Sequence, residues 1–107
     1  MTRIAARGHI DLLVLLALRQ GPGDGRDVIA RLHADSDGAL QLPEQTVHRT
    51  LHRLTRNRLV LRRRDPKVRR ARYVLSETGE SVWRSRLSQW QAFVRTVDAV
   101  ARVGDEK

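Results

Sequence analysis

Residues 44–73, EQTVHRTLHRLTRNRLVLRRRDPKVRRARY, combine one helical pattern with two short strand patterns. In the first half, Val47, Leu51 and Leu54 recur at helical spacing and define an apolar face. The opposite face is polar and basic, and it consists of Gln45, Arg49, His52 and Arg56, with Arg53 close by. We therefore expect a helix that begins at Pro43, ends before Arg58, and buries one face while the other stays in solvent.

The second half of this stretch predicts a β-hairpin. Residues 59–61 (LVL) and 72–75 (RYVL) are short runs rich in β-branched or aromatic side chains. Between them, residues 62–70 are polar, and they contain the turn-forming pair Asp65-Pro66. We expect two strands joined by a strongly basic loop.

Charge is distributed very unevenly along the chain. Residues 44–73 hold 11 of the 21 Lys and Arg residues but only two of the 12 acidic ones, Glu44 and Asp65, so the whole net charge of +9 falls there. A solvated charged face usually mixes both signs, and this one does not. The imbalance indicates a polyanionic partner, either nucleic acid or an anionic membrane surface, and we favour nucleic acid.

Two helices are expected before this stretch. The first covers residues 8–19 and is apolar nearly all round. Ile10, Leu13, Leu16 and Ala17 share one face, Leu12, Val14, Leu15 and Leu18 fill in around it, and we expect it to be buried on most sides. Gly21-Pro22-Gly23 ends it, and a shorter helix opens at Asp24 or Gly25. A loop follows at residues 35–38.

The last helix is predicted from Glu77 to about Arg102, with Ser76 as its cap. It carries a heptad-like apolar stripe made of Trp83, Leu87, Trp90, Val94, Val97 and Ala101. The roughly 70 residues before it must also close their own core, so they cannot cover a helix of about 38 Å. We expect a homodimer joined through this stripe; the alternative is a monomer whose stripe folds back onto the first helix.

The element order predicts a mainly α fold with a small β-hairpin, the winged helix-turn-helix arrangement. Residues 1–76 would form the DNA-binding domain and residues 77–107 the dimerisation helix. Such a fold places one helix in the major groove of double-stranded DNA, while a basic hairpin follows the phosphate backbone.

Three stretches resemble the PadR-type transcriptional regulators, in their short subclass with a single C-terminal helix. They are LLVLLALRQGPGDGRDVIARL (12–32), QTVHRTLHRLTRNRLV (45–60) and RYVLSETGESVW (72–83). The resemblance implies a DNA-binding regulator, expected here to be a repressor that binds a palindromic operator as a homodimer. It places Gln45, Thr46, His48 and Arg49 near bases, Arg53 on phosphate, and Lys67, Arg69 and Arg70 at the wing tip.

The chain departs from the family pattern at several positions. Asp24-Gly25-Arg26 stands where the family has His-Gly-Tyr, His48 replaces a Tyr, and Arg58 replaces a Gly. If Arg58 keeps the left-handed conformation of that Gly, its side chain costs stability. The resemblance also implies a ligand site, because some members bind planar aromatic compounds between subunits through a tryptophan that Trp90 matches. The alternative role of Trp90 and Trp83 is simple packing in the core and the dimer seam.

Other kinds of site are weakly supported. His48 and His52 have the spacing of a helical metal pair but no third ligand, so we expect DNA-facing side chains instead and no metal. Asp35-x-Asp37-Gly38 lacks the spacing of a calcium loop. The chain has no cysteine, and no nucleophile with a paired base is evident, so neither catalysis nor a cofactor is expected.

No signal peptide or membrane span is apparent, and a cytoplasmic protein is expected. Two competitors to a specific regulator stay open. One is a basic module that binds acidic protein or RNA, and the other is an architectural protein that coats DNA without sequence preference.

Overall fold

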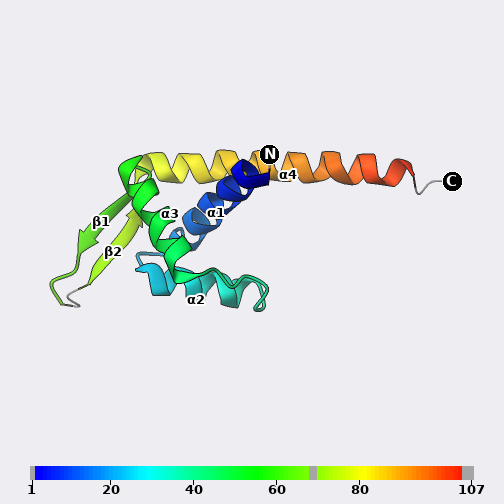
Figure 1. Ribbon diagram of the computed structural model, residues 1–107. Helices are drawn as coiled ribbons and strands as arrows, with labels where there is room; N and C mark the ends of the chain where they lie inside the picture. Colours follow the sequence, from blue (N-terminus) through cyan, green and yellow to red (C-terminus); the bar gives the residue numbers. More distant parts are fainter. Residues whose placement is uncertain (1, 68–69, 105–107) are drawn as a thin grey trace.

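The computed structural model describes residues 2–67 and 70–104, with side chains from His9 onward. Figure 1 shows a compact group of helices with a hairpin on one side and one long helix that projects from the other. The elements are α1 (Thr2–Leu18), α2 (Gly25–Asp35), α3 (Glu44–Arg56), β1 (Val60–Arg64), β2 (Ala71–Leu75) and α4 (Glu77–Val103). This is the predicted order of a winged helix-turn-helix followed by a long helix, and the fold class is confirmed.

The core lies where α1, α2 and α3 meet the start of the hairpin. Its fully buried side chains include Val14, Leu15, Val28, Val47, Leu51, Leu54 and Val60. Each of the three helices directs its apolar face inward, so the burial on α3 matches the spacing seen in the sequence. No helix among the described residues is both long and apolar enough to cross a membrane.

α1 differs from the prediction in its start. It begins at Thr2 rather than at residue 8, and it ends at Leu18. Its buried apolar side chains are Leu12, Val14, Leu15, Ala17 and Leu18, while Ile10, Leu13 and Leu16 are partly exposed. The helix is thus buried on most sides, as its apolar composition predicts, and its wheel alone does not tell which side α2 and α3 will cover most closely.

The hairpin is longer than expected. β1 and β2 pair antiparallel with Val60 opposite Leu75, Arg62 opposite Tyr73 and Arg64 opposite Ala71. Residues 62–64 therefore belong to a strand, where the prediction had placed them in the loop. Gly23 extends this sheet, because its N–H and carbonyl each bond to Tyr73, at 3.1 and 2.8 Å.

A tight junction joins the end of α3 to the start of α4. Arg58 adopts the left-handed conformation, with a φ of 62°, and its carbonyl accepts a hydrogen bond of 2.7 Å from Ser76 Oγ. The same Oγ accepts from the Gly79 N–H at 3.0 Å, so Ser76 caps α4 as predicted. Gly79 lies against the Leu59 carbonyl, which explains why a glycine stands in the Leu75-Ser76-Glu77-Thr78-Gly79 motif.

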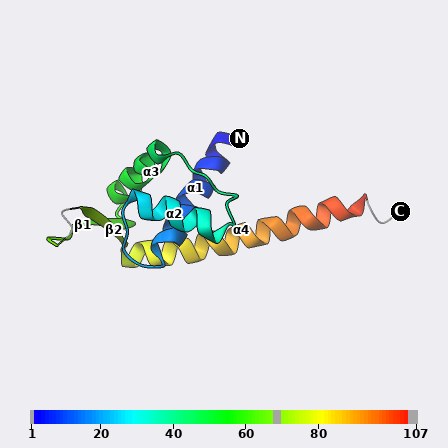
Figure 2. The same ribbon diagram turned by 90° about the horizontal axis from the view of Figure 1, so that it is seen from below.

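α4 is covered along only part of its length. Trp83 packs against the core and donates from Nε1 to Glu80 at 3.0 Å, with the Arg19 guanidinium 5.3 Å from its ring. Near Trp90 α4 leaves the body, and the molecule measures 63 × 28 × 24 Å (Figure 2). The exposed large side chains on that free half are Trp90, Phe93, Val97, Val100 and Val103.

The predicted stripe on α4 is therefore divided between two surroundings. Its first members, Trp83 and Leu87, are partly buried on their own protomer, as the folded-back alternative had it. Val94 is also partly buried, whereas Trp90 and Val97 are exposed. The division follows from α1, which contacts α4 as far as Trp90 through His9. In Figure 2 the N-terminal end of α1 lies away from α4.

Candidate nucleic-acid interface

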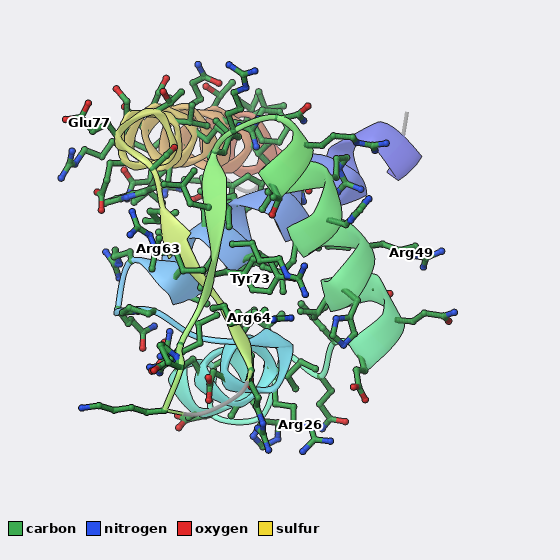
Figure 3. All side chains as sticks on the ribbon, turned by 90° about the vertical axis from the view of Figure 1, so that its left-hand side faces the viewer. Arg26, Arg49, Arg63, Arg64, Tyr73 and Glu77 are labelled. Atoms are coloured by element: carbon green, nitrogen blue, oxygen red, sulfur yellow. The ribbon has the colours of Figure 1, made fainter. Side chains whose placement is uncertain are left out.

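α3 presents a polar face to solvent because its apolar residues are all used in the core. Val47, Leu51 and Leu54 are buried, and the Thr50 hydroxyl bonds back to the Thr46 carbonyl at 2.8 Å. The predicted base-reading side chains Gln45, His48, Arg49 and His52 are exposed, and Thr46 is partly buried. In Figure 3, Arg49 projects into solvent on the side of α3 away from the hairpin. A helix of this kind has the shape and the donors needed in a major groove.

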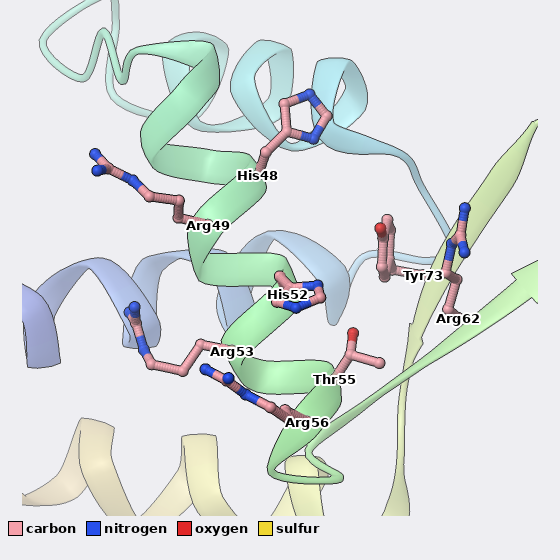
Figure 4. A pocket seen from close by; sticks show the side chains of 8 residues that line it. All are labelled: His48, Arg49, His52, Arg53, Thr55, Arg56, Arg62 and Tyr73. Carbon is pink, nitrogen blue, oxygen red and sulfur yellow. The ribbon is translucent and has the colours of Figure 1, made fainter.

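An open groove of about 640 Å³ runs between α3 and the hairpin. His48, His52 and Thr55 face it from the helix, and Tyr73 and Arg62 face it from the strands (Figure 4). Tyr73 and Arg62 were not among the predicted residues of this surface. The signal was available, because alternate residues of a strand share one face and these two are cross-strand partners.

The hairpin adds cations that lie free in solvent. Arg62, Arg63 and Arg64 are exposed along β1, and Lys67 is exposed near the tip. The Lys67 N–H donates to Asp65 Oδ1 at 3.0 Å and shapes the turn. Arg69, which was predicted to contact DNA, lies outside the described residues. The exposed row is therefore longer than the predicted tip, because it begins in the strand.

Arg70 is exposed, but it also holds the hairpin against α2. Its Nη1 lies 3.4 Å from Asp24 Oδ2, and Asp24 caps α2 by accepting from the Asp27 N–H at 2.9 Å. Partial burial raises the pKa of Asp24, but the Asp27 N–H bond and the Arg70 guanidinium outweigh it and hold that pKa below its ordinary value. The carboxylate thus stays charged, and it links the wing to the helix that supports α3.

Arg53 is placed differently from the other cations of α3. Its Nη2 donates to Asp11 Oδ1 on α1, and its side chain is only 26% exposed. The prediction put Arg53 on phosphate, and in the free protein this guanidinium is already engaged by a carboxylate 42 residues away. Asp11 was not singled out as a site residue, although a lone charge inside the apolar run of residues 10–18 was a signal for a buried ion pair.

The two histidines of α3 have separate surroundings. His48 Nε2 lies 3.4 Å from Glu44 Oε1, and its ring packs against Gly25 at the start of α2. His52 faces the groove described above. Within residues 2–67 and 70–104, no three His, Asp or Glu side chains gather at one point as metal ligands would.

Trp90, the predicted ligand-binding residue, belongs to a small aromatic group at the place where α4 leaves the body. Its ring meets that of His9 edge-on, with ring centroids 4.6 Å apart. Phe93 lies one turn further on, at 6.3 Å. This group is partly open to solvent, because Trp90 is 39% exposed.

The chain matches one protein family, and many solved structures have a similar fold. Residues 14–85 match the model of the family described as "Transcriptional regulator PadR-like family". No curated protein matches the chain.

Three solved structures illustrate the similarity of fold. A transcriptional regulator from Clostridium thermocellum superposes with a TM-score of 0.82 at 18% identity, covering 92% of this chain and 96% of that one. A PadR family transcription regulator from Clostridium difficile gives 0.76 at 18% identity, covering 87% and 98%. The regulator BpsR of Bordetella bronchiseptica, whose DNA binding is regulated by 6-hydroxynicotinic acid, gives 0.64 at 23% identity, covering 80% and 61%.

Proposed function

The chain belongs to the PadR-like family of transcriptional regulators, which are not enzymes, and from that premise we propose that it represses transcription as a homodimer on a partly palindromic operator. DNA binding itself is the activity of the family. The finer points, namely repression, the dimer and the operator, are our proposal. Repression would follow because a bound dimer excludes polymerase from the promoter, and such a protein would work at the nucleoid in the cytoplasm.

The observation that carries the proposal is the one-signed surface formed by α3 and the hairpin. All nine net charges of the chain fall within residues 44–73, and most of the cations there are exposed. An α-helix fits the major groove of B-DNA, and a flexible basic hairpin beside it suits the neighbouring backbone or minor groove. The groove between them is lined by side chains from both elements.

We assign separate roles to the exposed side chains. Gln45 and Arg49 would contact base edges, since Gln pairs bidentately with adenine and Arg with guanine. Thr46, His48 and His52 would lie against the same groove floor. Lys67, Arg69 and Arg70 would neutralise phosphates along the wing, together with the arginines of β1.

The dimer would form through α4, with residues 1–76 as the DNA-binding domain and residues 77–107 as the dimerisation helix. The apolar residues of the free half of α4 gather on a segment that the protomer leaves exposed, and a patch of this kind marks an interaction site. A two-fold axis between paired α4 helices would present two copies of α3 to half-sites about one turn of DNA apart, near 34–36 Å. Val97→Glu tests this by placing a charge in the seam, and sedimentation should then give a monomer where the wild type gives a dimer.

A planar aromatic effector at Trp90 completes the proposal. One support is the aromatic group of Trp90, His9 and Phe93, since flat rings stack on indole. The other is that the DNA binding of the structurally similar BpsR of Bordetella bronchiseptica is regulated by a planar aromatic compound, 6-hydroxynicotinic acid. Titration with 6-hydroxynicotinic acid should shift the Trp90 indole N–H resonance and leave that of Trp83 in place. If no indole signal moves for this or related planar acids, the effector is rejected.

The decisive experiment is a binding series over salt concentration with genomic fragments, random duplexes and RNA. A specific regulator should bind one fragment at least about a thousand-fold more tightly than random DNA. An architectural protein would show only the steep salt dependence of phosphate neutralisation, and a basic interaction module would prefer RNA or acidic protein.

Two matched variants assign the contacts. Arg49→Ala should lower the affinity for the selected fragment and relax its base preference at one position, at a cost of about 1–3 kcal/mol. Lys67→Ala removes the same charge from the wing and should weaken binding to all duplexes alike. If the two variants behave identically, the division into base and backbone contacts is wrong.

A further inference from the structure

Three helices meet at a single carboxylate. Asp11 on α1 has a side chain only 13% exposed; its Oδ1 accepts from Arg53 Nη2 on α3, and its Oδ2 lies 3.8 Å from Arg86 Nη1 on α4. The two arginines come from the proposed recognition helix and from the proposed dimerisation helix. Asp11 is therefore the point at which the DNA-contacting element and the long helix share one polar partner.

The two halves of this contact are unequal. The Arg53 pair is a direct hydrogen bond, whereas 3.8 Å is too long for one, so Arg86 is held by charge alone. Within the described residues, Arg53 Nε and Arg86 Nη1 are buried without a hydrogen-bond partner. One carboxylate thus faces two guanidiniums, with Oδ1 bonded to Arg53 and Oδ2 turned toward Arg86, so the positions of α3 and α4 are both tied to Asp11.

We propose that Asp11 is a positioning residue for DNA recognition, which fixes α3 relative to α4 through Arg53 and Arg86. The inference rests on the proposed function, and it concerns how the same DNA-binding surface is held. With α3 anchored to α4, the packing of the two α4 helices in a dimer would set the distance between the two recognition helices. Arg53 then orients the helix, and it does not neutralise a phosphate while Asp11 holds it.

Three variants separate positioning from simple loss of stability. Asp11→Asn removes the shared charge and frees Arg53. Arg86→Gln leaves the Asp11–Arg53 pair and cuts only the link to α4. Arg84→Gln is the matched control, because it removes the same charge from α4, two residues away, where the partner is Glu80 of the same helix at 3.5 Å.

Binding is compared between the selected genomic fragment and a random duplex, with each variant shown by circular dichroism to be folded at the assay temperature. Asp11→Asn should lower the ratio of specific to random affinity by roughly 10-fold. It should also steepen the salt slope on random DNA by about 0.9 for each released guanidinium. Arg86→Gln should lower the ratio without steepening that slope, and Arg84→Gln should leave the ratio unchanged.

A purely structural role would weaken binding to both DNAs by one factor and leave the salt slope alone, and that result would overturn the proposal. A second measurement needs no DNA. It therefore tests the proposal even if the protein binds no genomic fragment more tightly than random DNA and the proposed function fails. The coupling between Asp11→Asn and Arg53→Gln in thermal unfolding should change when Arg86 is Gln, because the three groups form one unit. Equal coupling in both backgrounds would show that α4 has no part in holding α3.

Discussion

Gly79 offers the sharpest test of how α4 is attached to the DNA-binding body. It lies in the first turn of α4, directly against the Leu59 carbonyl that also accepts the Ser76 N–H at 3.1 Å. An alanine Cβ here would stand 3.0 Å from the Leu59 carbonyl carbon, closer still to its oxygen, and 3.3 Å from Leu75 Cδ2. Carbon atoms pack at about 3.5–4.0 Å, so the α4 start and the Leu59 backbone would have to separate.

Two effects oppose each other in Gly79→Ala, and their magnitudes decide the sign. Helix propensity alone favours Ala by about 1 kcal/mol. Overpacking costs about 1–3 kcal/mol, and a weakened Ser76–Leu59 hydrogen bond costs about 1–3 kcal/mol more. The clash is with backbone, which cannot rotate away as a side chain would. We expect a net loss of about 1–5 kcal/mol, which for a chain of this size lowers Tm by roughly 4 °C or more.

The assay is thermal unfolding followed by circular dichroism, with all variants at one protomer concentration because a dimer's Tm depends on it. Thr78→Ala is the control, since Thr78 is exposed on the same turn and its replacement changes helix propensity without a clash. A Tm for Gly79→Ala equal to or above that of the wild type would refute the close packing of α4 on Leu59.

Three further predictions use the same protein. Arg58→Gly should raise stability by about 1 kcal/mol, because Arg58 holds a φ of 62° that costs a residue with a side chain about 1–2 kcal/mol. Arg58→Ala removes the same charge but keeps this backbone strain, so it should bring no such gain in Tm. Ser76→Ala should lose about 1 kcal/mol in urea unfolding, because the cap on Gly79 is removed, and a smaller loss than for Thr78→Ala would count against the cap. The folded-state pKa of Asp24 lies below its unfolded value of about 3.9, so its charge stabilises the protein above that pH and the benefit fades as pH falls through the lowered pKa. Unfolding of Asp24→Asn against wild type from pH 7 to 2 should show a difference that is constant above pH 5 and shrinks below about pH 4, and a difference that is undiminished at pH 2 would exclude this charge as its source.

Local signals were enough to predict most of the secondary structure. The spacing of Val47, Leu51 and Leu54 gave α3 its buried face, and the Ser76 cap gave the start of α4. The left-handed turn at Arg58 was also foreseeable, because the residue occupies a position where the resembling family has Gly. These features depend on residues within a few positions of one another, so they can be predicted from short stretches of the sequence.

The buried face of a helix, and the element that covers it, were harder to predict where the apolar residues do not define a single face. α1 is apolar nearly all round, and only packing against α2 and α3 decided that Leu12, Val14 and Leu15 are buried while Leu13 is partly exposed. On α4 the apolar stripe is continuous in sequence, yet its first members Trp83 and Leu87 are partly buried, and α1 reaches only as far as Trp90, through His9. Periodicity records that a stripe is apolar, and it carries no information about which neighbour covers it.

The sequence by itself determined the order of elements, the gathering of the positive charge onto α3 and the hairpin, and the family. Only the tertiary structure decided what individual cations do: Arg53 meets Asp11, Arg70 meets Asp24, and Arg49 remains in solvent. The physical reason is range. Charge composition and helical period are properties of neighbouring residues, whereas an ion pair between positions 11 and 53 exists only after α1 and α3 have packed and brought the two side chains together.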